Sequence, residues 1–173
     1  MPTRRRSSWT RPPDPSGTNS TVARSLRRIC GLSLGAMVAT RFALDYPDRT
    51  ASLTLSGGQV RPPRVLMGIQ NAIMRVLPER AVAPPGMSKR TLLAVLTAVG
   101  ATDFREDLSR ISAPTLVMCE SKDRPKLPAA RQLAAAIPNA ELQIVPGAGH
   151  EWNTQLPEEF SARLNRFLTR VNA

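Results

Sequence analysis

CGLSLGA, at residues 30–36, sets Ser33 in a Gly-x-Ser-x-Gly pattern that leads directly into a helix-forming sequence. This pattern is typical of a strand that turns sharply into a helix and holds the serine hydroxyl at the tip of the turn. Gly31 and Gly35 would allow the chain to pass close to itself, where a β-carbon would clash. The pattern alone also arises by chance, so its meaning depends on the sequence around it.

The two sides of this pattern differ. Downstream, the spacing of apolar residues predicts a helix over 36–46, and alternation predicts a strand over 51–55. Upstream, Arg27 and Arg28 leave only Ile29 and Cys30 as an apolar lead-in, whereas strands usually have five or six residues. We therefore expect half of a β-α-β unit with a stunted first strand.

Charge is concentrated at the start of the chain. The net charge is +11, and residues 1–30 contribute +6 of it, from seven arginines and Asp14. This asymmetry predicts a basic arm at 1–28, with a short basic helix over 21–28, attached to a domain at 29–173. Such an arm could bind nucleic acid, but no aromatic platform accompanies the arginines, and the interpretation we favour is a solvated tail.

Composition also argues against a membrane protein. No run reaches the ~18 apolar residues of a membrane span, and Arg4–Arg6 is followed by polar residues instead of the apolar core of a signal peptide. Cys30 and Cys119 each end an apolar segment, so we expect both to be reduced and largely buried. These features predict a cytoplasmic protein.

The second half of the chain alternates between strands and helices. Residues 59–110 contain no strand pattern and predict a helical insertion with helices over 65–77 and 89–99, the second capped by Ser88 and ended by Gly100. Strands follow over 115–119 and 141–145, and helices begin at Pro128 and Pro157. The alternation predicts an α/β fold, a short parallel sheet with flanking helices.

Three polar residues follow predicted strands, namely Ser33, Asp123 and His150. The carboxyl ends of parallel strands share one edge, so these side chains should come together there. A serine hydroxyl becomes a nucleophile when an imidazole takes its proton, and a carboxylate orients that imidazole. His150 is the only histidine, and Glu120 is the alternative acid. The single histidine and scattered acids predict no metal or cofactor.

From Gly31 onward the sequence resembles the α/β-hydrolase superfamily, in its small bacterial esterase, lactonase and haloperoxidase-like branch. The resemblance lies in GLSLGAMVATRFALDYPDRTASLTLSGG and in ISAPTLVMCESKDRPKLPAARQLAAAIPNAELQIVPGAGHEWNTQLPEEF. It implies Ser33 as nucleophile, Asp123 as acid, His150 as base and the Leu34 backbone N–H as an oxyanion donor. It further implies a small ester or lactone substrate and a lid at 59–110.

The lid would carry apolar residues that we expect to pack helix on helix instead of contacting substrate. They are Leu66, Ile69, Ile73, Leu92, Val95 and Leu96.

The sequence departs from this family before the strand-to-helix turn that holds Ser33, which is called the nucleophile elbow. Family members place about four strands there, whereas only thirty residues precede Gly31. We therefore expect a truncated, partial α/β-hydrolase fold that lacks the second oxyanion donor and has an open sheet edge. The resemblance also places Cys30 and Cys119 two strands apart, too far for a disulfide. A hydrolase with impaired activity is one reading. A non-catalytic remnant or partner-binding module, with a second copy covering the open edge, is the other.

Overall fold

The computed structural model describes residues 26–172 and shows one parallel sheet. All four strands run in the same direction, as the sequence predicts, so their carboxyl ends lie along one edge. In spatial order they are β1 (Arg27–Leu32), β2 (Thr50–Ser56), β3 (Thr115–Glu120) and β4 (Ala140–Val145). The predicted arm lies outside the described residues as far as residue 25.

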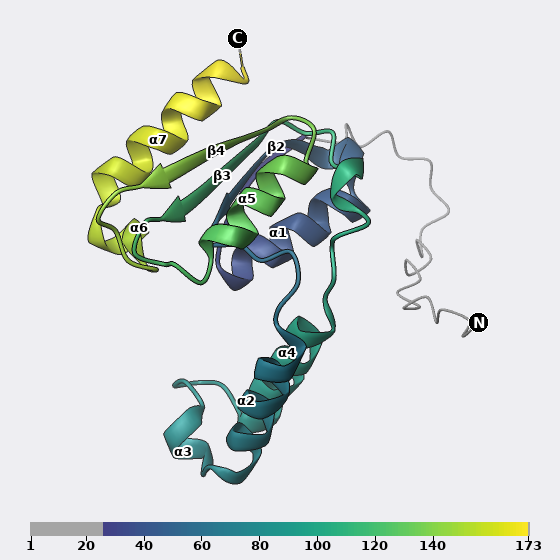
Figure 1. The fold of residues 1–173 in the computed structure, drawn as a ribbon, viewed down its shortest axis with the longest axis vertical. Coiled ribbons are helices and arrows are strands. Elements are labelled where there is room, and N and C mark those ends of the chain that lie inside the picture. The colour runs from purple at the N-terminus through teal and green to yellow at the C-terminus, as the bar shows by residue number, and fades with distance from the viewer. Residues whose placement is uncertain (1–25, 173) are drawn as a thin grey trace, which may run out of the picture.

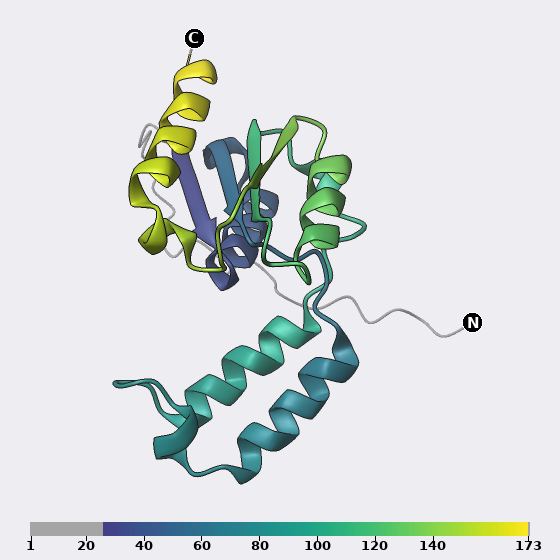
Figure 2. The ribbon, with the colours of Figure 1, turned by 60° about the vertical axis from the view of Figure 1, so that its left-hand side comes forward.

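Helices cover both faces of the sheet. α1 (Leu34–Asp45) and α5 (Leu127–Ala136) pack on one face, and α6 (Trp152–Gln155) and α7 (Pro157–Arg170) pack on the other (Figures 1 and 2). The central strand β3 serves both layers, because its side chains alternate between them. Its residues are all buried, which explains the unbroken apolar run in the sequence.

The expectation of a stunted first strand is wrong. β1 has six residues and begins at Arg27, so Arg27 and Arg28 belong to the sheet and not to the arm or to a basic helix. β1 is an edge strand of the described sheet, and both arginine side chains are exposed there, which is why the strand tolerates them. Beside it, β1 and α1 line an open hollow of about 620 Å³ that includes Ile29, Val38 and Phe42.

The cysteines follow the sequence prediction only in part. Both are free thiols, and Cys119 is fully buried, with a pKa raised to about 11 chiefly by that burial. Cys30 is exposed, contrary to expectation, because it lies on the open edge strand. The two residues lie on β1 and β3, with β2 between them.

The turn after β1 explains one of the two glycines around Ser33. A β-carbon on Gly31 would lie 2.2 Å from the carbonyl oxygen of Gly35, a distance at which the backbone would have to move. A β-carbon on Gly35 would meet nothing within 4 Å. The expected close approach therefore constrains Gly31 but not Gly35.

Gly31→Ala should therefore lower the free energy of unfolding by about 2 kcal/mol, as overpacking against backbone does. Gly35→Ala is the matched control, and it should leave stability unchanged or raise it by up to about 1 kcal/mol, since alanine favours helix. Urea denaturation of both variants measures the difference. Equal effects at the two positions would contradict the close approach at Gly31.

Residues 59–110 form a helical hairpin between β2 and β3, as predicted. It contains α2 (Arg64–Val76), α3 (Glu79–Val82) and α4 (Lys89–Ala101), followed by a short 3-10 turn at Leu108–Arg110. Another 3-10 turn, at Pro47–Arg49, lies outside the hairpin and directly precedes β2. Figures 1 and 2 show α2 and α4 side by side, projecting away from the sheet. Ser88 caps α4, with its Oγ accepting from Thr91 N–H at 3.1 Å. No helix within residues 26–172 combines the length and apolarity needed to cross a membrane.

One expectation for the hairpin, the position where its second helix ends, is wrong. Gly100 does not end α4 but lies inside it, and a β-carbon there would be 3.4 Å from Met67 Cβ, so glycine allows α2 to approach closely. Leu66, Ile69 and Ile73 are each about half exposed (49–59%), so any packing between the helices covers them only in part. At helical spacing these three share one side of α2, and Met67 lies on another side.

Candidate active site

Ser33 occupies the turn between β1 and α1 in a strained conformation. Its φ is +54°, and it is the one residue other than glycine in the described range with a positive φ. The Ser33 N–H donates to the carbonyl oxygen of Ser56 at 2.8 Å, which fastens the turn to the end of β2. Such backbone strain persists when the surrounding structure holds it, and it is common at active sites.

Leu34 follows at the first position of α1. Within the described residues its N–H has no acceptor, as is usual for the first turn of a helix. Free N–H groups and the positive end of the helix dipole together favour a negative charge at this point. The Leu34 amide is therefore able to stabilise a developing oxyanion.

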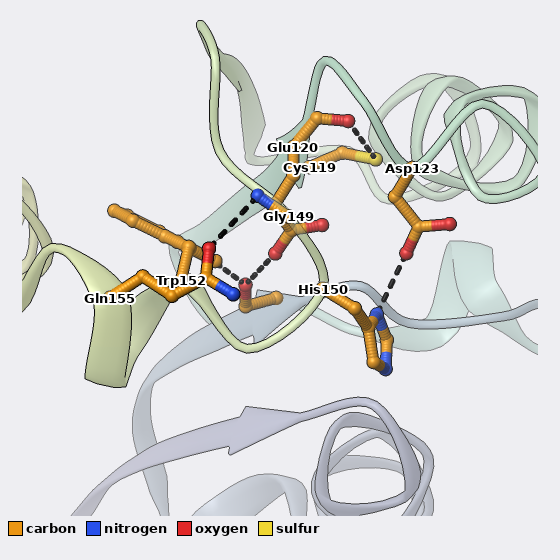
Figure 3. Close-up of polar contacts among 8 residues, drawn as sticks. Cys119, Glu120, Asp123, Gly149, His150, Trp152 and Gln155 are labelled. Carbon is orange, nitrogen blue, oxygen red and sulfur yellow. Dashed lines mark hydrogen bonds and ion pairs between the residues drawn. The ribbon is translucent and has the colours of Figure 1, made fainter.

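Asp123 and His150 are brought together from the ends of β3 and β4. His150 Nδ1 lies 2.7 Å from Asp123 Oδ2, and the two side chains are 40% and 13% exposed (Figure 3). Asp123 is held in a tight turn, because its N–H donates to Glu120 O at 3.1 Å and its carbonyl accepts from Lys126 N–H at 2.9 Å. The hydrogen bond can fix the imidazole ring and its tautomer, leaving Nε2 as the nitrogen able to accept a proton.

The loop that carries His150 is anchored by contacts that the sequence did not predict. The Gly147 N–H donates to Ser121 Oγ at 2.9 Å, and the Gly149 N–H donates to Gln155 Oε1 at 3.2 Å. Two residues after His150, the buried Trp152 side chain packs in one cluster with Leu116 and Met118 of β3. A serine after β3 and a glutamine in a short helix carry no motif that would have revealed these contacts.

Glu120, the alternative acid, is fully buried at the end of β3 and makes no hydrogen bond to His150. Its Oε1 accepts from Ser56 Oγ at 3.2 Å, and the same Ser56 oxygen accepts from Trp152 Nε1–H at 2.9 Å. Its Oε2 is buried without a hydrogen-bond partner. Burial raises the pKa of this carboxyl group.

Ser33 lies at the same edge of the sheet but is not hydrogen-bonded to His150 in the described residues. Ser56, which accepts from the Ser33 N–H, is followed by Gly57, and a β-carbon on Gly57 would lie 3.1 Å from His150 Cε1. The end of β2 therefore connects the elbow to the imidazole. Catalytic hydrogen bonds are often long in the absence of substrate and tighten when it binds.

The prediction that the acids are scattered is wrong. One potential ligand atom from each of Glu120, Asp123 and His150 lies within 4.8 Å of the other two. Carboxylate oxygens and an imidazole nitrogen are a donor set that divalent metals accept. However, His150 Nδ1 and Asp123 Oδ2 lie 2.7 Å apart and are hydrogen-bonded to each other. As it stands, the cluster is arranged as a hydrogen-bonded pair beside a buried carboxylate.

The whole sequence can be compared with known families. Residues 3–163 match a model of the Alpha/beta hydrolase family, which is most of the chain. The chain belongs to this family. The resemblance read from the elbow and the histidine loop is thereby confirmed, and so is the α/β-hydrolase fold class.

Curated relatives include hydrolases of enteric bacteria. The chain is 29% identical over 178 residues to the "Putative carbamate hydrolase RutD" of Shigella flexneri serotype X, covering 83% of this chain and 66% of the relative. It is also 29% identical over 169 residues to the protein of that name in Escherichia coli K12, with coverages of 79% and 63%. The chain thus spans just under two thirds of these relatives' length.

Solved structures share the fold. A hydrolase from Pseudomonas aeruginosa PA01 aligns with a TM-score of 0.72 at 24% identity, covering 83% of this chain and 64% of its own. The enol-lactonase of Burkholderia xenovorans LB400 aligns with a TM-score of 0.75 at 20% identity, covering 84% and 66%. At these identities the likeness establishes the fold of this hydrolase-family chain and not its substrate.

Proposed function

We propose that the chain is a serine hydrolase that acts on small carboxylic esters or lactones. Ser33 is its nucleophile, His150 its base and Asp123 the carboxylate that orients the base. The single observation that carries this proposal is the 2.7 Å hydrogen bond between His150 Nδ1 and Asp123 Oδ2, at the strand edge where Ser33 occupies a strained turn.

The chemistry follows from these positions. His150 Nε2 takes the proton of the Ser33 hydroxyl as its oxygen attacks the substrate carbonyl carbon, and Asp123 stabilises the imidazolium that forms. The carbonyl oxygen becomes an oxyanion beside the Leu34 N–H. The imidazolium then gives its proton to the leaving alcohol, which departs and leaves an acyl group on Ser33. Water, deprotonated by His150, releases the acid and restores the serine.

The substrate class is part of this proposal. Curated relatives carry the name "Putative carbamate hydrolase RutD", and a carbamate, like an ester or a lactone, has a carbonyl carbon bonded to a heteroatom that can leave. In this proposal the α2–α4 hairpin is the lid, and the exposed apolar side chains of α2 favour an uncharged acyl group.

A fluorophosphonate probe tests the proposal, because it forms a stable bond only with an activated serine. We expect the probe to label folded protein at one site, and peptide mapping by mass spectrometry should place the adduct on Ser33. Ser33→Ala should abolish the labelling, and heat-unfolded protein should not react. Labelling that persists in Ser33→Ala, or folded protein that does not react, would contradict the proposal.

A further inference from the structure

Glu120 is a charged residue in an unfavourable place. Its side chain is fully buried, Oε1 has one neutral hydroxyl as a side-chain partner, and Oε2 has none. A buried carboxylate without a paired cation lowers stability, and burial accordingly raises the pKa of Glu120. The contacts at Oε1 could be made equally well by a glutamine, so packing alone does not account for a glutamate here.

The unpartnered oxygen lies on the side of the site that holds the imidazole. A β-carbon on Gly57 would be 3.8 Å from Glu120 Oε2, 3.4 Å from His150 Nδ1 and 3.1 Å from His150 Cε1. Both groups thus lie against the same point of the β2 end. A Glu120 oxygen, a ring nitrogen of His150 and an oxygen of Asp123 lie within 4.8 Å of one another. Glu120 therefore faces the ring that Asp123 holds by a hydrogen bond (Figure 3).

Glu120 is also tied to the loop that carries the imidazole. Ser56 Oγ donates to Glu120 and accepts from Trp152 Nε1–H, and Trp152 lies two residues after His150. This relay joins the ends of β2 and β3 to the start of α6. It fixes where the carboxylate lies relative to the imidazole.

We propose that Glu120 is a positioning residue of the site, whose buried negative charge acts on His150 together with Asp123 and favours the imidazolium form. The proposal rests on the hydrolase function proposed above, in which His150 gains a proton during each half of the reaction. Glu120 does not replace Asp123, which makes the hydrogen bond. It adds a second charge on a fully buried side chain, so that charge is screened less than a charge in solvent would be.

Other titratable groups share this neighbourhood. In the described residues, Glu120 interacts electrostatically with four such groups, namely Asp123, His150, Lys126 and Cys119. Lys126 is half-buried; burial lowers its pKa, and its attraction to Asp123, Cys119 and Glu120 raises it. It is the cationic side chain of this cluster, and its charge opposes that of the two carboxylates.

Because His150 is the only histidine, its titration can be followed without interference. The experiment records the Cε1–H resonance of His150 by NMR in protein carrying ¹³C-labelled histidine, from pH 4 to pH 9. Glu120→Gln keeps the shape and an acceptor for Ser56 but removes the charge. We expect its titration midpoint to fall by about 0.6 pH unit or more, the effect of one charge ~5 Å away even with water-like screening. Ser56→Ala, which keeps the charge, should move the midpoint by less than half as much.

The pH dependence of the free energy of unfolding supplies a second readout. The Glu120 pKa is raised in the folded state, so the folded protein binds that proton more tightly, and this contribution to stability is lost as pH rises through the folded-state pKa. Glu120→Gln lacks this loss. The free energy of unfolding of Glu120→Gln minus that of wild type should therefore become more positive from pH 4 to pH 8. If Glu120 contributed only a structural hydrogen bond, this difference would not change with pH.

Both readouts are independent of turnover, so they separate this inference from the proposed function. A His150 midpoint that shifts in a protein without esterase activity would support the charge effect and reject the hydrolase. A midpoint unchanged in Glu120→Gln would overturn the inference even in an active enzyme. Should Glu120→Gln fail to fold, Glu120→Met offers a similar volume without charge and carries the same expectation.

Discussion

Ser33→Ala should lower kcat for hydrolysis of p-nitrophenyl acetate by about 10⁴-fold or more, with little change in KM, because no other group takes the place of the nucleophile. Ser33 alone in the described residues combines the strained turn, the free neighbouring amide of Leu34 and a place at the strand edge that holds His150. The loss should fall on the chemical step, since alanine keeps the backbone of the elbow. Initial rates over a range of substrate concentrations measure both constants.

Ser161→Ala is the matched control, because Ser161 is an exposed serine on α7. Its kcat should stay within twofold of wild type. A Ser33→Ala variant that keeps more than about a tenth of wild-type kcat would show that the observed hydrolysis does not pass through this serine, and the assignment of the nucleophile would fail.

Asp123→Asn should lower kcat by about 10³- to 10⁴-fold at neutral pH. The amide has nearly the shape of the carboxylate, so it can still bond to His150 Nδ1, which lies 2.7 Å from Asp123 Oδ2 in the wild type. An asparagine NH₂ facing Nδ1 would select the tautomer that cannot accept the Ser33 proton, and the charge that stabilises the imidazolium would be lost. Steady-state rates from pH 6 to pH 9 test this.

Asp48→Asn serves as the control, since Asp48 is an exposed carboxylate in the 3-10 turn before β2. Glu120→Gln gives the contrast within the site and should cost much less in kcat than Asp123→Asn. The reverse order of effects would mean that Glu120 is the catalytic acid and that the hydrogen bond to Asp123 is secondary.

Much of the fold could be predicted because its signals are local. β3 is an unbroken apolar run because helices cover both of its faces, and Pro157 marks the start of α7. Ser33, Asp123 and His150 follow β1, β3 and β4, and these positions predict a shared edge, because parallel strands end on the same side. These inferences needed only spacing and composition.

The features that could not be predicted depend on what lies beside an element in space. Arg27 and Arg28 resemble a solvated arm until β2 is seen to pair with them, and Cys30 is exposed because β1 is at the edge of the described sheet. The relay from Trp152 through Ser56 to Glu120 joins residues up to 96 positions apart. No periodicity records a contact of that kind.

A crystal structure of the chain after reaction with a p-nitrophenyl phosphonate is the most direct test of the active-site assignment. We predict phosphorus bonded to Ser33 Oγ, a phosphoryl oxygen accepting from the Leu34 N–H, and His150 Nε2 within hydrogen-bond distance of the modified oxygen, with the contact to Asp123 retained. An adduct on another residue would contradict the account. So would an adduct on Ser33 whose phosphoryl oxygen points away from Leu34 while His150 remains out of reach.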